Sequence, residues 1–419
     1  MDSVLEKYRD MWAPMIQPDD YEYTESDIAP RTMVTKEGIR VERNDFEIMN
    51  ATNKRIACSL YEHQTGNKPL VIYSHSHSGN KAEGAFLLEP LIDNFSLLIF
   101  DYTGYGKSSK APCTLGVKEH SDLLCVITHV RDHYNFSRIY LWGRSMGAVS
   151  VLLLAHATQS KCCDGIIVDS PFSSTKEMLC IHMEKVPNFA LHMIFPLLGA
   201  KLLKETGYDI MGIDLNDKIK EIKLPIFFIV GLDDNIAGAV HVRTLYENYG
   251  GSKKMLRMFE GEHAEDRSEK IINELVNFLM ELEDYYKSLE VLNNPLNPIP
   301  QGAQYQQARV KRLLPKKLDL LSQDEPISVP LTPKKSPKST LKPAPQEDQK
   351  PPHETPPSPQ DPLTTRNEII AILAQIDDNP SIHEPAIDNH IYNMKQKTSA
   401  TGTEGSLAQS HQSSKKVST

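Results

Sequence analysis

Short apolar runs alternate with amphipathic stretches along the first 290 residues of the chain. The runs LVIYS, LLIFD, GIIVD and IFFIV are almost continuously apolar, a pattern typical of strands that are buried on both faces of a parallel sheet. Two earlier runs alternate in part, as half-exposed antiparallel strands do. Strands are predicted at residues 40–49, 54–61, 69–74, 96–101, 138–142, 165–169, 225–231 and 254–259.

Stretches with apolar residues at helical spacing lie between these strands. They predict helices at about 81–93, 115–134, 145–158, 174–203, 239–249 and 266–288. This alternation favours the α/β class, with an eight-stranded, mostly parallel sheet flanked by helices. Ligands of such folds bind at the carboxyl ends of the strands, so the residues that follow each strand are the candidates for a site.

The composition changes near residue 290 and divides the chain of 419 residues. Its last 129 residues hold 18 of the 28 prolines, whereas both tryptophans lie in the first part. The proline-rich part lacks the apolar surface that would offset the entropy of folding, so we predict that it is disordered. The predicted organisation is an N-terminal extension at 1–39, an α/β domain at 40–290 with a helical cap at about 173–223, and a disordered tail at 291–419.

Charge, hydropathy and cysteine content argue against nucleic-acid-binding, membrane-spanning, secreted and metal-binding proteins. The first 290 residues carry a net charge of −11 and the last 129 carry +2, which together give −9 for the chain. The acidic first part argues against nucleic acid as its ligand. No run approaches 18 apolar residues, and the first residues are acidic where a signal peptide would be basic, so neither an integral membrane segment nor secretion is expected. The six cysteines lack a metal-binding spacing and are interpreted as reduced thiols. A cytoplasmic protein with no metal and no cofactor is therefore predicted.

A G-x-S-x-G pattern follows the fifth predicted strand. Ser145 lies between Gly143 and Gly147, and an apolar helix is predicted directly after it. Such a strand–turn–helix setting exposes the serine hydroxyl on a strained turn, and the flanking glycines allow close backbone packing. The backbone N–H of Met146, at the start of the helix, can donate to an oxyanion. The pattern predicts a nucleophilic serine, and an ordinary strand-to-helix turn is the alternative.

A nucleophilic serine needs a base, and the base needs an acid that orients it. His263 follows the last predicted strand and is the candidate base. Asp234 follows the strand before it and is the candidate acid, preferred over Asp233 because it lies two residues before an apolar residue. Asp169, at the end of an earlier strand, is a third candidate for the acid.

The strand LVIYS ends in small polar residues that can supply a second oxyanion donor. The backbone N–H of His77 is the expected donor. The side chains of His75 and His77 are predicted to brace this turn rather than to act as the base, because both precede the serine in the chain.

Residues 40–288 resemble the α/β-hydrolase superfamily, in the branch of serine aminopeptidase-like (S33-type) hydrolases. The segments that carry the resemblance are VIYSHSHSGN, FDYTGYGKSS, LWGRSMGA, VDSPFSS, GLDDNI and GEH. The resemblance implies a catalytic triad of Ser145, Asp234 and His263, with an oxyanion hole formed by the amides of Met146 and His77. It also implies a serine hydrolase that cleaves ester or thioester bonds of an acyl substrate through an acyl-serine intermediate.

Two departures from the family pattern leave other functions open. This chain has His75-Ser76 where related hydrolases usually have His-Gly, and serine lacks the freedom of glycine at positive φ. A distorted oxyanion hole is therefore expected, and a catalytically weakened interaction protein with a phosphorylatable tail is the alternative to an enzyme. A peptidase of the serine aminopeptidase type is another alternative, although the chain lacks the Gly-Gly-Pro-Gly loop of proline aminopeptidases.

The segment at 178–203 is rich in methionine, leucine, isoleucine and phenylalanine. Hydrolases of the resembling family carry a cap at this position, and an apolar cap suits acyl chains because methionine adapts its shape. A crossover helix with ordinary core residues is the alternative.

The tail carries features of a regulated segment. Proline-directed sites occur at Thr332, Ser336, Thr355 and Ser358, and residues 311–320 combine basic residues with leucines. A solvated basic stretch is the favoured interpretation of residues 311–320, and a docking peptide for a proline-directed kinase is the alternative. A proline-directed kinase or another partner is therefore a candidate to bind the tail. Residues 365–377 have helical spacing and are predicted to form a short helix, either transient or folded on a partner.

Overall fold

A computed structural model describes residues 9–17, 22–63, 68–183 and 186–293. The predictions for the tail, including the kinase sites and the short helix, lie outside these residues. Only residues 291–293 of the predicted tail are described, and they complete the last helix.

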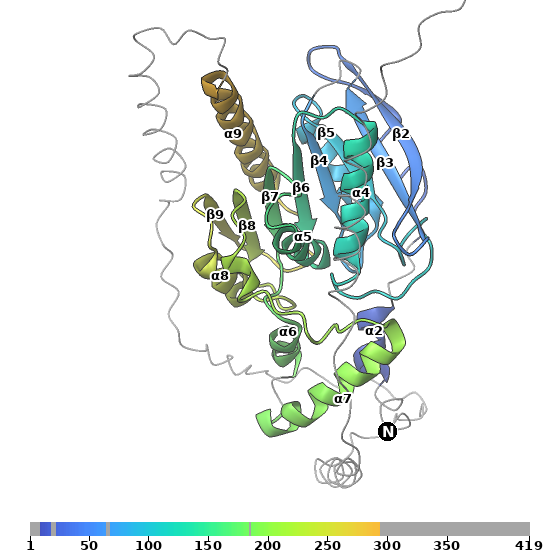
Figure 1. The fold of residues 1–419 in the computed structure, drawn as a ribbon, viewed down its shortest axis with the longest axis vertical. Helices are drawn as coiled ribbons and strands as arrows, with labels where there is room; N and C mark the ends of the chain where they lie inside the picture. The colour runs from blue at the N-terminus through green and yellow to red at the C-terminus, as the bar shows by residue number, and fades with distance from the viewer. Residues whose placement is uncertain (1–8, 18–21, 64–67, 184–185, 294–419) are drawn as a thin grey trace, which may run out of the picture. The chain divides into compact units, whose positions relative to one another are not determined.

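The described residues form one sheet of nine strands (Figure 1). The strands are β1 (Thr32–Val34), β2 (Arg40–Met49), β3 (Arg55–His63), β4 (Leu70–Ser74), β5 (Ser96–Phe100), β6 (Ile139–Arg144), β7 (Gly165–Asp169), β8 (Ile226–Gly231) and β9 (Lys254–Phe259). Their order in the sheet is β1-β2-β3-β5-β4-β6-β7-β8-β9. The pairs β1–β2, β2–β3 and β3–β5 are antiparallel, and the five pairs from β5–β4 to β8–β9 are parallel.

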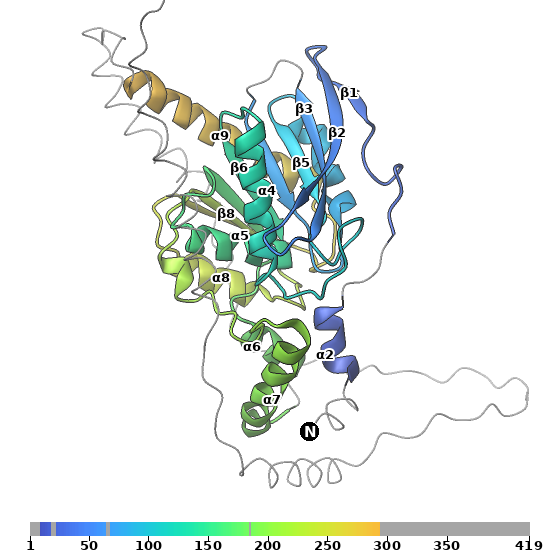
Figure 2. The ribbon, with the colours of Figure 1, turned by 45° about the vertical axis from the view of Figure 1, so that its right-hand side comes forward.

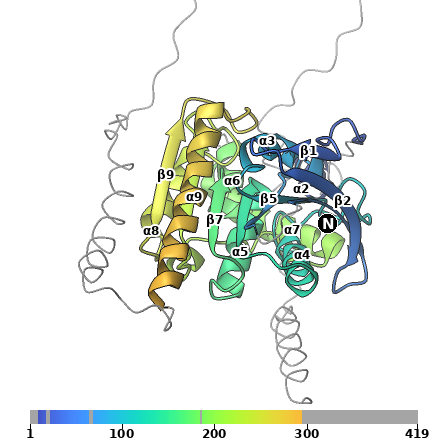
Figure 3. The same ribbon diagram turned by 90° about the horizontal axis from the view of Figure 1, so that it is seen from above.

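Helical segments precede, connect and follow the strands. They are α2 (Arg9–Ile16), η1 (Lys81–Leu87), α3 (Leu88–Leu91), α4 (Glu119–His133), α5 (Met146–Ala157), α6 (Thr175–His182), α7 (Asn188–Thr206), η2 (Lys218–Lys220), α8 (Ala239–Asn248) and α9 (Glu269–Asn293). One core cluster joins the sheet to α4, α5 and α8, and a second joins its other face to α3 and α9. Figure 3, which looks from above, shows α3 across the sheet from α4 and α5.

The sequence pattern predicts the observed sheet because apolar residues occupy the positions that are buried in it. The strands β4, β5, β7 and β8 are buried along their whole length, as their continuous apolar runs predict, whereas β2 alternates between buried and exposed residues. The predicted α/β class with a mostly parallel sheet is thus confirmed. The additional strand, β1, lies within the predicted N-terminal extension, and its three residues are too few to show a periodic pattern.

The single helix predicted at 174–203 is two helices, and this prediction was wrong. The first, α6, begins after Ser174, whose side chain accepts a hydrogen bond from the N–H of Glu177, and ends at His182. The second, α7, begins after Pro187. Proline has no N–H to donate and is favoured at the start of a helix, where an N–H would have no partner within the helix, so Pro187 favours a new start here.

Four parallel strands bring the candidate residues to one edge of the sheet. The strands β4, β6, β8 and β9 run in the same direction, so their carboxyl ends lie together. Figure 2 shows α2, α6 and α7 below this edge, with α2 beside α7. Within the described ranges, no helix combines the length and the apolar character needed to span a bilayer.

Candidate active site

Ser145 lies on a strained turn between β6 and α5. Its φ is 52° and its ψ is −117°, a conformation that costs a non-glycine residue on the order of 1–3 kcal/mol. Its N–H donates to the carbonyl of Asp169 over 2.7 Å. A Cβ added at Gly143 would lie 2.4 Å from the carbonyl oxygen of Gly147, and one added at Gly147 would lie 2.0 Å from that of Ser74. Close backbone packing therefore requires both glycines of the G-x-S-x-G pattern.

A chain of hydrogen bonds joins Ser145 to His263 and Asp234. The Oγ of Ser145 lies 2.9 Å from Nε2 of His263, and Nδ1 of His263 lies 2.8 Å from Oδ2 of Asp234. With Nδ1–H donating to the carboxylate, Nε2 is free to accept the serine proton. Asp234 and His263 are buried, and Ser145 is half-buried. The structure thus brings together the three residues that the sequence analysis selected.

The turn after β8 holds the carboxylate of Asp234 in place. Its Oδ1 accepts hydrogen bonds from the backbone N–H groups of Ile236, Ala237 and Gly238, at 3.0, 2.9 and 3.2 Å. Burial by itself raises the pKa of Asp234, but the hydrogen bond and charge of His263 and the backbone donors lower this pKa to about 2. The carboxylate is therefore ionised at neutral pH and can stabilise an imidazolium at His263.

The two alternative acids lie elsewhere. Asp233 is exposed. Both carboxylate oxygens of Asp169 accept hydrogen bonds from the guanidinium of Arg267, at 2.9 and 2.8 Å. Arg267 in turn donates to the carbonyl oxygen of His263 over 3.2 Å. Asp169 therefore holds the loop of the histidine through an arginine and does not contact the imidazole.

The oxyanion loop after β4 is braced by buried side chains. His75 is fully buried; its Nδ1 donates to the carbonyl of Ser76 over 2.7 Å, and its Nε2 accepts from the N–H of Tyr102 over 3.2 Å. Burial lowers the pKa of His75, so the ring is neutral and keeps this tautomer. The structural role predicted for His75 follows from these contacts.

Ser76 does not strain the loop, contrary to the expectation from the sequence. Its φ is not positive, so the backbone at this position does not need glycine. Its hydroxyl donates to the Glu83 carboxylate over 2.6 Å, and its N–H donates to the same group at 3.2 and 3.3 Å. Tyr73 also donates to Glu83, over 2.6 Å. At this position the conformational freedom of glycine is therefore not needed, and the Ser76 hydroxyl anchors the loop to Glu83.

Met146 and His77 line the pocket onto which Ser145 opens, where an oxyanion hole is expected. Met146 is the first residue of α5, so its N–H has no acceptor within the helix. The imidazole of His77 accepts from the hydroxyl of Tyr105 at Nδ1, over 2.9 Å, and donates from Nε2 to the carbonyl of Pro14, over 2.8 Å. His77 therefore connects the oxyanion loop to α2.

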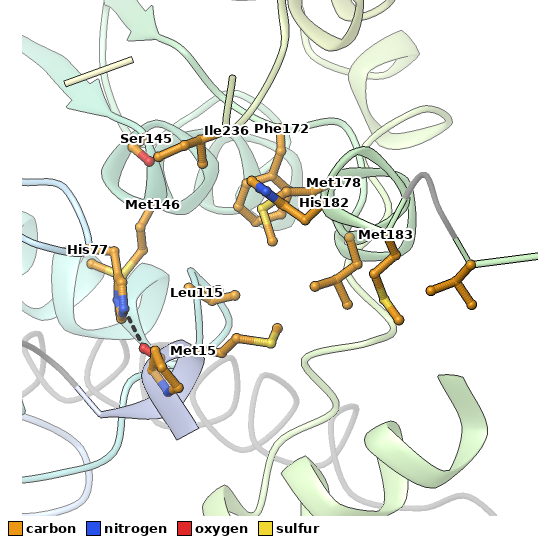
Figure 4. Close-up of a pocket in the computed structure, with 13 residues that line it drawn as sticks. Met15, His77, Leu115, Ser145, Met146, Phe172, Met178, His182, Met183 and Ile236 are labelled. Carbon is orange, nitrogen blue, oxygen red and sulfur yellow. Dashed lines mark hydrogen bonds between the residues drawn. The ribbon is translucent and has the colours of Figure 1, made fainter. Parts of the chain in front are cut away.

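The pocket beside Ser145 has a volume of about 750 Å³ and a mainly apolar lining (Figure 4). A volume of this size is typical of a site for a small organic ligand. One wall comes from α6 and the residues after it, and the other comes from α2, the oxyanion loop and Leu115. The lining residues are Pro14, Met15, His77, Leu115, Ser145, Met146, Phe172, Met178, Leu179, His182, Met183, Val186 and Ile236.

Several residues of the site carry no signal that sequence reasoning could use. Pro14 and Met15 belong to the predicted N-terminal extension, which was given no part in the site. Arg144 donates to the carbonyl oxygens of His263 and Glu265, at 3.1 and 2.9 Å, from the variable position before the serine. Among the described residues, no group of three or more His, Cys, Asp or Glu side chains could hold a metal ion.

The fold and the arrangement of these loops are those of the α/β-hydrolase class. Residues 75–206 match the family model described as "Serine aminopeptidase, S33". This match begins in the oxyanion loop and contains the G-x-S-x-G pattern. This region of the chain is similar to the serine aminopeptidase-like branch of the α/β-hydrolase superfamily.

Relatives and a solved structure are similar to parts of this chain. An uncharacterized membrane protein of Saccharomyces cerevisiae is 29% identical over 241 residues, which are 55% of this chain and 72% of that protein. An α/β-hydrolase domain-containing protein of Arabidopsis thaliana is 26% identical over 183 residues, 42% of this chain and 57% of that protein. An esterase from Pyrococcus furiosus aligns with a TM-score of 0.49 at 21% identity, over 64% of this chain and 98% of the esterase chain.

Proposed function

We propose that this chain is a serine hydrolase that cleaves ester or thioester bonds of an acyl substrate through a covalent acyl-Ser145 intermediate. The observation that carries the proposal is the hydrogen-bonded chain from Ser145 through His263 to Asp234, which opens onto an apolar pocket. A serine, an imidazole and a buried carboxylate in this order are the groups that acyl transfer needs.

The proposed reaction assigns one task to each group. His263 takes the proton of Ser145 as the serine oxygen attacks the acyl carbonyl carbon, and Asp234 stabilises the resulting imidazolium. The amides of Met146 and His77 donate to the oxyanion. His263 then gives the proton to the departing alcohol or thiol, which leaves the acyl group on Ser145. A water molecule activated by His263 attacks this ester and releases the acid.

The pocket lining favours an acyl group over the amino terminus of a peptide. A peptide's ammonium group needs a carboxylate partner, and none of the described lining residues is Asp or Glu. Four of them are methionines, which adapt to flexible apolar chains. These observations support an acyl esterase or thioesterase rather than an aminopeptidase. The six cysteines are free thiols, which supports the proposed cytoplasmic location.

Labelling with a fluorophosphonate probe, followed by hydrolysis assays, tests this proposal. The wild-type chain should be labelled and should hydrolyse p-nitrophenyl octanoate and an octanoyl thioester faster than prolyl-p-nitroanilide. Ser145→Ala should abolish labelling and lower hydrolysis on the order of 10³-fold or more. Ser252→Ala is the matched control, because Ser252 is exposed and precedes β9 at the opposite edge of the sheet.

The outcomes separate the three candidate functions. A folded wild-type chain that neither takes the label nor hydrolyses any of the three substrates would support the non-enzymatic interaction protein. Faster hydrolysis of the prolyl anilide would support the peptidase. Retained labelling in Ser145→Ala would move the nucleophile to another residue.

A further inference from the structure

Helix α2 is held against the candidate site from two directions. On the side of the α/β domain, the carbonyl of Pro14 accepts from Nε2 of His77, and the carbonyl of Ile16 accepts from the N–H of Cys113, both over 2.8 Å. On the side of the segment between β7 and β8, the Nζ of Lys201 in α7 lies 4.8 Å from the centre of the Trp12 ring. The helix therefore spans from the oxyanion loop to α7.

The packing of α2 is that of a core element. Trp12, Ala13 and Ile16 are only 4, 6 and 5% exposed and belong to the same core cluster as α4 and α5. The adjacent residues Pro14 and Met15 line the pocket. The buried residues Trp12, Ala13 and Ile16 thus anchor α2, and Pro14 and Met15, which lie between them in the sequence, form part of the pocket wall.

Met15 faces the pocket across from the residues of α6. Figure 4 shows Met15 beside Leu115, with Met178 and His182 on the opposite wall. An acyl chain attached to Ser145 would run between these walls. Met15 would contact such a chain from the wall opposite α6.

We infer that α2 is the specificity-determining wall of the acyl site, that Met15 sets the length of the unbranched acyl chain accepted, and that His77 positions α2 against the oxyanion loop. This inference rests on the proposed function, because it gives that site its substrate class. The occupant is an unbranched acyl chain because the two walls present flexible, apolar side chains to it. The contribution of His77 is indirect: its imidazole bonds the carbonyl of Pro14 and thereby fixes the neighbouring Met15.

A chain-length series of p-nitrophenyl esters on the full chain tests the role of Met15. With acetyl, butyryl, octanoyl, dodecanoyl and hexadecanoyl esters, the wild-type kcat/KM should rise about fourfold per buried methylene until the pocket is full. Met15→Trp should lower the octanoyl-to-acetyl ratio of kcat/KM about tenfold or more, because indole occupies the path of the chain. Met15→Ala should move the optimum to a longer ester.

Met49→Trp is the matched control for these variants. Met49 is 56% exposed at the end of β2 and is absent from the pocket lining, so its replacement should leave the ratio unchanged. If wild type hydrolyses the esters but neither Met15 variant changes the ratio relative to Met49→Trp, the inference is overturned and the proposed function stands. If wild type neither hydrolyses the esters nor takes the fluorophosphonate label, both the inference and the proposed function are overturned.

Hydrogen exchange separates the positioning role of His77 from a general loss of stability. In His77→Phe, the amides of residues 9–17 should exchange at least tenfold faster while those of β4 and β6 keep their protection, and the octanoyl-to-acetyl ratio should fall. His77→Gln retains a side-chain N–H donor and should restore part of the protection. Unchanged exchange at residues 9–17 in His77→Phe would overturn the positioning role.

Discussion

The guanidinium of Arg144 donates from Nη2 to the main-chain carbonyl of His263 over 3.1 Å. Arg144 directly precedes Ser145, so the turn that carries the candidate nucleophile also holds the loop that carries the candidate base. A second bond from the same nitrogen reaches the carbonyl of Glu265 over 2.9 Å. The position of the imidazole relative to the serine therefore depends on a residue outside the candidate triad.

Removal of this arginine should impair turnover more than binding. Arg144→Met loses both hydrogen bonds to the histidine loop. Because a small misplacement of a catalytic group slows the chemical step, kcat should fall about 10–100-fold while KM stays nearly unchanged. Steady-state kinetics with p-nitrophenyl octanoate measures both constants. Arg243→Met is the control, since Arg243 is exposed on α8. Equal effects of the two substitutions would contradict the role of Arg144.

Asp234 should be the acid that matters for turnover. Asp234→Asn removes the negative charge that supports the imidazolium and reverses one hydrogen bond, so kcat should fall about 10³–10⁴-fold. Asp233→Asn is a matched control because Asp233 is exposed, and it should stay within about twofold of wild type. A severe loss in Asp233→Asn with a mild one in Asp234→Asn would exchange the two assignments.

The lowered pKa of Asp234 predicts a pH-dependent part of the stability. Since this pKa is about 2 in the folded chain and 3.8 ordinarily, the unfolded chain binds the proton more readily. The ionised carboxylate thus contributes about 2 kcal/mol above pH 4, and this contribution is lost as the pH falls from about 4 to about 2. Urea unfolding at pH 6, 5, 4 and 3 should show the gap between wild type and Asp234→Asn shrinking with acidity. A gap that is constant with pH would contradict the lowered pKa of Asp234.

Gly147 should tolerate no side chain. A Cβ there would lie 2.0 Å from the carbonyl oxygen of Ser74, so Gly147→Ala should lower the free energy of unfolding by about 3 kcal/mol. Gly199→Ala is the control. Its Cβ would lie 3.5 Å from Met211, and alanine favours a helix interior by about 1 kcal/mol over glycine, so this variant should be neutral or more stable. Chemical unfolding of both variants checks the expected order, and similar stabilities would show that β4 and α5 can separate at little cost.

The sequence by itself determined the class of fold and the residues that deserved attention. Apolar runs identify buried parallel strands because every residue of such a strand meets a helix layer, and this pattern is local. The serine pattern between a strand and a helix is local as well, and so is the placement of Asp234 and His263 just after strand ends. The parallel direction of β6, β8 and β9 then brings these three residues to one edge.

Only the tertiary structure decided which groups contact one another. Asp169 ends β7, whereas Asp233 and Asp234 follow β8. Asp169 binds Arg267, Asp233 is exposed to solvent, and Asp234 binds His263. The φ of Ser76 depends on Glu83 and the surrounding loop rather than on its own residue type.

The role of α2 was likewise outside the reach of the sequence. His77 and Pro14 are 63 residues apart, and Arg144 and His263 are 119 apart. Local periodicity reports which side of an element is apolar, but it carries no information on which distant element covers that side. The packing of the whole domain determines which element covers α2. Burial of Trp12 and Ile16 is favourable only where α7 and the loop at Cys113 already lie.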